Sequence, residues 1–255
     1  MPCDAAPGAA RPAREDTGTV LFEEIDHRQT PMGVISLRRR REPSLQVDVY
    51  EARLDDEFLM SSLFTVAEVA LARLGLAEVA GDDLDVVVGG LGLGYTAHAA
   101  LADARVSSVR VVDALAEVIG WHRDRLLPLS PGLVEDPRCA LVHGDFFALT
   151  AGGAPFGDGA PHRHHAILLD VDHSPSRVLH PSHSAFYEVD GLRRVGERLH
   201  PGGVFALWSD DPPEDRFVSA VGEVFATCDA HVVTFANPYT DGEASNTVYV
   251  ARVEV

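Results

Sequence analysis

Carboxylate side chains follow several short apolar runs of the sequence, at points where buried strands would end. Asp113 follows SVRVV, Asp145 follows ALVHG, and Asp170 follows HAILL. In an open parallel sheet, ligands bind beyond the carboxyl ends of the strands, so these side chains would surround one site. Because an unpaired buried charge is costly, their placement favours a polar binding site.

A glycine-rich turn precedes these carboxylates. Gly90, Gly92 and Gly94 have the spacing GxGxG in VVVGGLGLGY. A dinucleotide fingerprint, GxGxxG, would require glycine where Tyr95 stands, so a pyrophosphate-binding dehydrogenase is disfavoured. The alternative is a tight strand-to-helix turn without a ligand.

Two of the carboxylates have the positions expected of nucleoside-binding groups. Asp113 lies 19 residues after Gly94, near the spacing of about 20 at which an acidic residue binds ribose hydroxyls. Alone, Asp113 could cap a helix that begins at Ala114; with the glycines, it predicts ribose binding. Asp145 could accept a hydrogen bond from the exocyclic amine of a base.

Three ionisable residues crowd the end of one predicted strand, in DVDHSP. Asp170, Asp172 and His173 are of the types that act as general acids and bases, and we predict them as catalytic residues. The alternative is that Asp172 caps a turn before Pro175 and that His173 is solvated.

Six histidines fall within 22 residues, but they lack the HxxxH spacing or the cysteines of a metal site. We therefore expect no metal, while a proton-transfer role for one of them stays open. These histidines are His162, His164, His165, His173, His180 and His183.

Short Val/Ile/Leu-rich runs alternate with amphipathic segments in the second part of the chain, which predicts an α/β fold with a mainly parallel sheet. The last two runs, AHVVTFA and NTVYVARV, are joined too closely for a crossover helix, so they should form an antiparallel hairpin. We expect three parts: a disordered segment over residues 1–19, an N-terminal β-hairpin region over 20–59, and a Rossmann-like domain over 60–255. Residues 60–76 have helical spacing, and Arg38–Arg41 is predicted at a solvated hairpin tip.

The composition limits the partners. The 255 residues include 21 basic ones, all arginine, against 39 Asp and Glu, giving a net charge of 21 − 39 = −18. Without lysine there is no Schiff-base or P-loop chemistry. The acidic balance disfavours nucleic acid and anionic membranes and favours a neutral or cationic small molecule. Three isolated cysteines and the lack of a signal-peptide core or a long apolar run predict a cytoplasmic protein.

From about Leu21 to the C-terminus, the motifs resemble the polyamine aminopropyltransferases, the spermidine synthase family, whose members have the fold of S-adenosylmethionine-dependent methyltransferases. The similar segments are VVVGGLGLG, VRVVDALAEVI, DPRCALVHGDFFAL, HAILLDVDHSP and AFYEVDGLRRVGERLHPGGVFALWS. The resemblance implies a doubly wound, methyltransferase-type sheet. It also implies a homo-oligomer that assembles through the N-terminal hairpin.

Carried over by position, the resemblance implies that Asp113 binds the ribose, Asp145 the adenine amine, and Gln29 the nucleoside. Asp170 would deprotonate the attacking amine. The co-substrate would be S-adenosylmethionine or its decarboxylated form, and the acceptor a small amine. We take Glu68, Tyr95 and Tyr239 as the substrate-binding residues of the acceptor pocket, to which Met60, Phe64 and Phe186 could add an apolar wall.

Departures from the family pattern lie in the polyamine half of the site. The loop GGGDGG has Leu93 in place of its aspartate, Tyr-His-Glu has become Val66-Ala67-Glu68, and a hairpin glutamine is missing near Gly33. The leading hypothesis is transfer of an aminopropyl group to an amine. A methyltransferase for a small molecule and a non-catalytic nucleoside-binding module remain alternatives.

Overall fold

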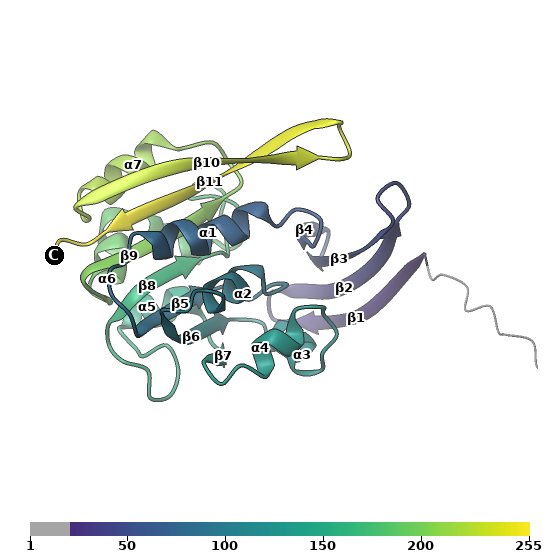
Figure 1. Cartoon of the computed structure of the whole chain (residues 1–255), viewed down its shortest axis with the longest axis horizontal. Coiled ribbons are helices and arrows are strands. Elements are labelled where there is room, and N and C mark those ends of the chain that lie inside the picture. Colours follow the sequence, from purple (N-terminus) through teal and green to yellow (C-terminus); the bar gives the residue numbers. More distant parts are fainter. Residues whose placement is uncertain (1–20) are drawn as a thin grey trace, which may run out of the picture.

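The computed structural model describes residues 21–255, so the disordered segment predicted over residues 1–19 lies outside the described residues. Two sheets build the molecule, and Figure 1 shows the smaller one standing to the side of the larger one. The smaller sheet is antiparallel in the order β1-β2-β3-β4. Its strands are β1 (Phe22–Thr30), β2 (Gly33–Glu42), β3 (Val47–Leu54) and β4 (Glu57–Ser61).

The larger sheet has seven strands in the order β10-β11-β9-β8-β5-β6-β7. Five neighbouring strands are parallel, β11 is antiparallel to β9, and β10 is antiparallel to β11. This confirms the α/β fold with a mainly parallel sheet and an antiparallel C-terminal hairpin. The strands are β5 (Leu84–Gly89), β6 (Val106–Asp113), β7 (Cys139–His143), β8 (His164–Leu169), β9 (Leu199–Ser209), β10 (Thr227–Asn237) and β11 (Gly242–Arg252).

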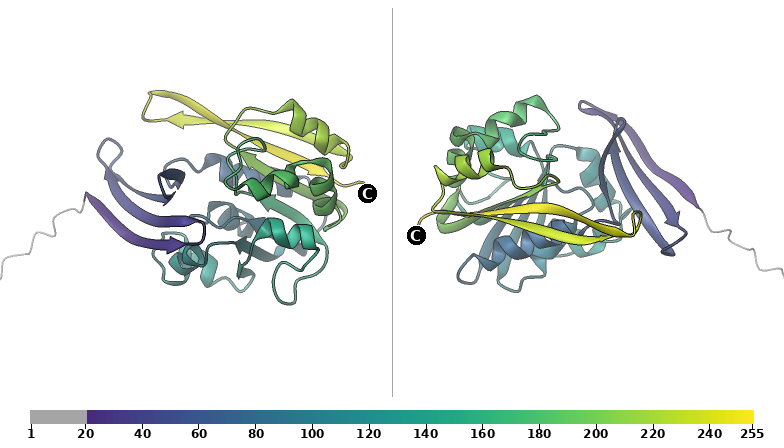
Figure 2. Two further views of the ribbon diagram at one scale, coloured as in Figure 1. Left: turned by 180° about the vertical axis from the view of Figure 1, so that it is seen from behind. Right: turned by 90° about the horizontal axis from the view of Figure 1, so that it is seen from above.

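Helices cover both faces of the larger sheet, as Figure 2 shows from behind and from above. One buried cluster joins α1, α2, α3 and α4 to the sheet, and a second, rich in phenylalanine, joins the remaining helices to the opposite face. The helices are α1 (Val66–Ala77), α2 (Tyr95–Leu101), α3 (Ala116–Arg123), α4 (Ser130–Val134), α5 (Phe146–Gly152), α6 (Val189–Gly196) and α7 (Asp215–Gly222), with the 3-10 helix η1 (Pro181–Tyr187).

The smaller sheet packs against the larger domain through apolar and polar contacts. Ile35 and Leu54 belong to the same buried cluster as α1 and α2. Trp121 of α3 donates a hydrogen bond to Asp26 of β1 over 2.7 Å. At the other end, Arg40 contacts the hydroxyl of Tyr239, in the turn between β10 and β11. These contacts fix the position of the smaller sheet relative to the larger one.

Two expectations about the N-terminal region were wrong. The helix predicted from residue 60 begins at Val66, because Met60 belongs to β4 and pairs there with Ala52 of β3. Arg38–Arg41 lies inside β2, not at a hairpin tip, and acidic residues of β1, β2 and β3 pair with its guanidinium groups. The predicted β-hairpin region is thus a four-stranded sheet.

The first residue of the turn after β5, Gly90, must be glycine. Gly90 has φ +93°, and a Cβ there would collide with the carbonyl oxygen of Asp170. That oxygen is fixed, since the amide of Asp170 donates to the carbonyl of Gly89 over 2.8 Å. Backbone of the two neighbouring strand ends therefore approaches closely, and no side chain fits between them.

We expect Gly90→Ala to destabilise the protein more than Gly81→Ala, which is its matched control. Gly81 has a similar φ of +89° but open space around its Cβ position, so alanine there carries only the backbone cost, about 1–2 kcal/mol. Gly90→Ala should exceed that loss by at least about 2 kcal/mol because a backbone atom must move. Urea unfolding of both variants measures the difference, and equal losses would contradict the expected collision with the Asp170 carbonyl.

Candidate active site

A cavity of about 740 Å³ lies between the two sheets, beyond the carboxyl ends of the parallel strands. Its wall contains residues of β4, α1, the turn after β5, and the segments after β6, β7, β8 and β9. Eight of the predicted site residues line it: Glu68, Gly90, Gly92, Tyr95, Asp113, Asp145, Asp170 and His173. Residues far apart in the sequence thus meet where the topology predicts a ligand.

Asp113 stands at the end of β6 and faces the turn after β5. Its two carboxylate oxygens accept hydrogen bonds from the amides of Leu91 (2.9 Å) and Leu115 (2.8 Å). Burial raises the pKa of Asp113, while these backbone amides act in the opposite direction. Each oxygen has a second lone pair, so the fixed carboxylate can still accept from two neighbouring hydroxyls, as a ribose would offer.

Neighbouring side chains hold the glycine turn in shape. His122 of α3 donates from Nε2 to the carbonyl of Gly92 over 2.9 Å, and burial lowers the pKa of His122, which favours the neutral ring. The sulfur of Met60 accepts from the amide of Leu93 over 3.0 Å. Leu93, which replaces the aspartate of the family loop, is itself buried. The turn is therefore rigid before any ligand arrives.

Asp145 precedes α5, after the end of β7, which is the neighbour of the strand that ends in Asp113. Its side chain accepts from the amide of Ala148 over 3.1 Å and so caps the helix. The residue is exposed and lines the cavity, so its remaining lone pairs can accept from an exocyclic amine.

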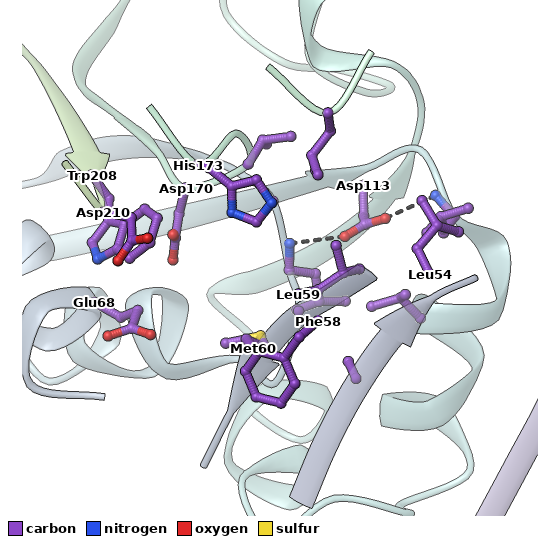
Figure 3. A pocket seen from close by; sticks show the side chains of 18 of the residues that line it. Leu54, Phe58, Leu59, Met60, Glu68, Asp113, Asp170, His173, Trp208 and Asp210 are labelled. Atoms are coloured by element: carbon purple, nitrogen blue, oxygen red, sulfur yellow. Dashed lines mark hydrogen bonds between the residues drawn. The ribbon is translucent and has the colours of Figure 1, made fainter. Parts of the chain in front are cut away.

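Asp170 lies at the opposite end of the cavity, among further carboxylates. Figure 3 shows Asp170, Glu68 and Asp210 gathered on one side, away from Asp113. Thr96 of α2 donates to Asp170 over 2.6 Å, which leaves one carboxylate oxygen free of side-chain donors. Burial raises the pKa of Asp170 to about 6. Burial, and then repulsion from Asp170, raises the pKa of Glu68 to about 8.

This carboxylate pair can hold one proton and one negative charge near neutral pH. Such a pair can accept a proton from a nucleophile at a pH where ordinary carboxylates are already ionised and weakly basic. Glu68 is only 7% exposed, so its ionised form has little water to stabilise it. A cation entering this end of the cavity would favour ionisation of both groups.

The other two predicted catalytic residues have different surroundings. His173 lines the cavity, and its Nε2 contacts Glu57 of β4 over 2.8 Å, which links the loop after β8 to the smaller sheet. Asp172 is 1% exposed and does not line the cavity. It accepts instead from Leu179, His183 and Tyr187, so its contacts position other residues.

Besides Asp172, four predicted residues lie outside the cavity wall. Gln29 is exposed on β1 and donates to the carbonyl of Thr30 over 3.3 Å. Gly94 caps the start of α2, Tyr239 binds the smaller sheet, and Phe186 packs in the second core cluster. A ligand role for Gln29 and Tyr239 stays a prediction.

Several cavity residues were not singled out by the sequence motifs. Trp208 and Asp210 come from the end of β9, and Arg177 and His183 from the segment after β8. Arg177 donates to Asp210 (3.0 Å) and Asp211 (2.8 Å), so its guanidinium is already paired. For Trp208 and Asp210 the available signal was their position at the carboxyl end of β9, a strand that its apolar run predicts.

Other features of the described residues bear on ligands and membranes. In residues 21–255, no group of three His, Cys, Asp or Glu side chains could hold a metal ion. Within the same range, no helix is long and apolar enough to cross a membrane.

Comparison with known proteins gives one curated relative and many solved structures. No family model matches the chain. The polyamine aminopropyltransferase 2 of Pseudomonas aeruginosa is 28% identical over 160 residues, which cover 59% of this chain and 42% of that protein. The match thus spans less than half of the length of the relative.

The solved structures show the fold. A spermidine synthase from Thermotoga maritima superposes with a TM-score of 0.69 at 16% identity, covering 90% of this chain and 72% of that one. A spermidine synthase in complex with the transition-state analogue AdoDATO superposes with a TM-score of 0.69 at 17% identity, covering 90% of this chain and 73% of that one. The chain therefore has the fold of spermidine synthases, as the sequence motifs predicted.

We expect Glu68→Gln to stabilise the protein increasingly between pH 4.5 and 8. The pKa of Glu68 is raised from its ordinary value of 4.5 to about 8. The unfolded chain therefore releases this proton first, and the folded protein loses relative stability until the pH passes the folded value. Glutamine has no charge and avoids that loss.

The measurement is urea unfolding at pH 5 and pH 8.5. The gain from Glu68→Gln should be larger at pH 8.5 by at least about 1.4 kcal/mol, the equivalent of one pKa unit. Glu78→Gln, at the exposed end of the same helix, is the control and should show no such difference. A gain from Glu68→Gln that is equal at the two pH values would contradict the proposed burial of charge.

Proposed function

We propose that the chain is a spermidine-synthase-like transferase that moves an aminopropyl group from decarboxylated S-adenosylmethionine to an amine. One observation carries the proposal: a single cavity has the carboxylates Asp113 and Asp145 at the ends of the neighbouring strands β6 and β7, and Asp170 with Glu68 on the side away from Asp113 (Figure 3). The first pair suits ribose hydroxyls and a base amine. The second suits a cationic amine that must lose a proton.

The chemistry needs few groups from the protein. An alkylammonium with a pKa of about 10 is not a nucleophile, so Asp170 takes its proton. The freed nitrogen lone pair then forms a bond to the carbon beside the sulfonium, and the carbon–sulfur bond breaks with its electrons going to sulfur. Sulfur leaves as a neutral thioether, so no acid is required. The remaining contribution of the site is to hold the two reactants in line.

The charges of the cavity wall support the decarboxylated donor. The intact donor has a carboxylate that would need a cation or free backbone donors nearby. Among the described lining residues, Arg177 is the sole arginine, and both Asp210 and Asp211 already pair with it. An aminopropyl ammonium, in contrast, would meet the carboxylates of Glu68 and Asp170.

The acceptor end differs from the family pattern, so the identity of the amine is open within its class. Leu93 is buried under Met60 and supplies no carboxylate. Phe64, Tyr95 and Trp208 line the cavity instead. The wall thus combines carboxylates with aromatic rings, a combination that binds ammonium groups through charge and cation–π contacts. The cytoplasmic location and the homo-oligomer stay predictions from the sequence.

We expect Asp170→Asn to reduce turnover by at least about 100-fold, the scale of general-base catalysis. The assay incubates the protein with decarboxylated S-adenosylmethionine and a panel of mono-, di- and triamines, and follows the release of 5′-methylthioadenosine by mass spectrometry. Affinity for that nucleoside should stay nearly unchanged, because Asp113 and Asp145 are intact.

Asp158→Asn, an exposed carboxylate that does not line the cavity, serves as the control and should retain full turnover. Full turnover of Asp170→Asn would exclude Asp170 as the base. If the unchanged protein releases no 5′-methylthioadenosine with any amine, aminopropyl transfer to these acceptors is refuted.

A further inference from the structure

A buried aspartate and a histidine form a paired unit beside the nucleoside end of the cavity. Asp172 accepts from Nδ1 of His183 over 2.9 Å, from the hydroxyl of Tyr187 over 2.7 Å and from the amide of Leu179 over 2.7 Å. The side chains of Asp172 and His183 are 1% and 8% exposed. Three donors around one carboxylate fix its orientation, so the imidazole is fixed as well.

This pairing sets the chemistry of the second ring nitrogen. An ionised carboxylate only accepts, so Nδ1 of His183 must carry the donated hydrogen. In a neutral ring Nε2 is then an acceptor. Nε2 has no hydrogen-bond partner among residues 21–255, and it is not one of the fully buried polar atoms that lack a partner. His183 lines the cavity, so Nε2 is the ring nitrogen that remains to accept from a ligand there.

Contacts locate His183 near Asp145. The imidazole lies flat on the ring of Phe147, with centroids 3.9 Å apart and planes 20° apart. Phe147 is two residues after Asp145, and both line the cavity together with Ser182, the neighbour of His183. This wall of the cavity therefore offers two acceptors, the carboxylate of Asp145 and Nε2 of His183.

Resting on the proposed function, we infer that His183, held by Asp172, is a specificity-determining residue that recognises the 6-amino group of the purine base. An exocyclic amine has two hydrogens to donate, and this wall has two acceptors for them. A 6-oxopurine presents an oxygen at the same place, and two acceptors facing an oxygen repel it. Asp172 acts as a positioning residue in this arrangement.

The test compares the affinities of two nucleosides by calorimetry: 5′-methylthioadenosine and its 6-oxo counterpart, 5′-methylthioinosine. The unchanged protein should prefer the 6-amino form by at least about tenfold. His183→Phe keeps a flat ring on Phe147 but removes the acceptor, so that preference should fall by about fivefold, the scale of one hydrogen bond. A purely structural role would lower both affinities together and leave their ratio unchanged.

His162→Phe is the matched control, since it makes the same substitution at an exposed histidine that does not line the cavity; its ratio should equal that of the unchanged protein. Should His183→Phe not fold, His183→Asn, whose shorter amide does not reach the same point, must show the same loss of preference. An unaltered ratio in the folded His183 variant would overturn the inference and leave the proposed function standing. Binding of neither nucleoside to the unchanged protein would overturn both.

Discussion

Two backbone hydrogen bonds just beyond the end of the parallel sheet place the whole site. The amide of Gly90 donates to Val112 over 2.9 Å, and the amide of Asp170 donates to Gly89 over 2.8 Å. They extend the ladders of β5 with β6 and with β8 by one step, and so fix the ends of three strands at one level. Gly90, Asp113 and Asp170 lie side by side for this reason. Only glycine allows the close approach at position 90.

Because the aligned strand ends bring several carboxylates into one cavity, their negative charges must be stabilised, and this is achieved differently at the two ends of the cavity. At the end with Asp113, the backbone amides of Leu91 and Leu115 stabilise the carboxylate and fix its orientation. At the end with Asp170, the charges of Glu68 and Asp170 repel each other, and one side-chain donor, Thr96, serves Asp170. A binding site with a surplus of buried negative charge is poised for a cation, because the incoming charge offsets the repulsion. The two ends of the cavity therefore differ in their donors: Asp113 accepts from two backbone amides, whereas Asp170 accepts from the hydroxyl of Thr96.

The sequence predicted the features that depend on local pattern and order along the chain. The strands from β5 to β11, the glycine turn, and the placement of Asp113, Asp145 and Asp170 around one cavity all follow from apolar runs and their ends. The features it did not reveal depend on contacts between distant segments. Met60 has helical spacing with its successors, yet strand pairing with Ala52 decides its conformation. From the sequence alone, the arginines of β2 resemble a solvated hairpin tip, because their acidic partners on β1, β2 and β3 become visible only in the structure.

Side-chain direction was also beyond the sequence. Asp172 and His173 are adjacent, but one points into the protein and the other into the cavity. His183 was one of six loop histidines with no distinguishing mark, and only its contacts with Asp172 and Phe147 separate it from the rest. Conversely, motif order identified the fold at a level of sequence identity where no family model matches.

The most direct test of the proposed donor is calorimetric binding of S-adenosylmethionine and of its decarboxylated form, side by side, to the purified protein. The two ligands differ by one carboxylate, and the described cavity wall pairs its one arginine with aspartates. We predict that the decarboxylated form binds at least several-fold more tightly. Tighter binding of the intact form would contradict aminopropyl transfer and favour methyl transfer, and binding of neither would leave a nucleoside-dependent function without support.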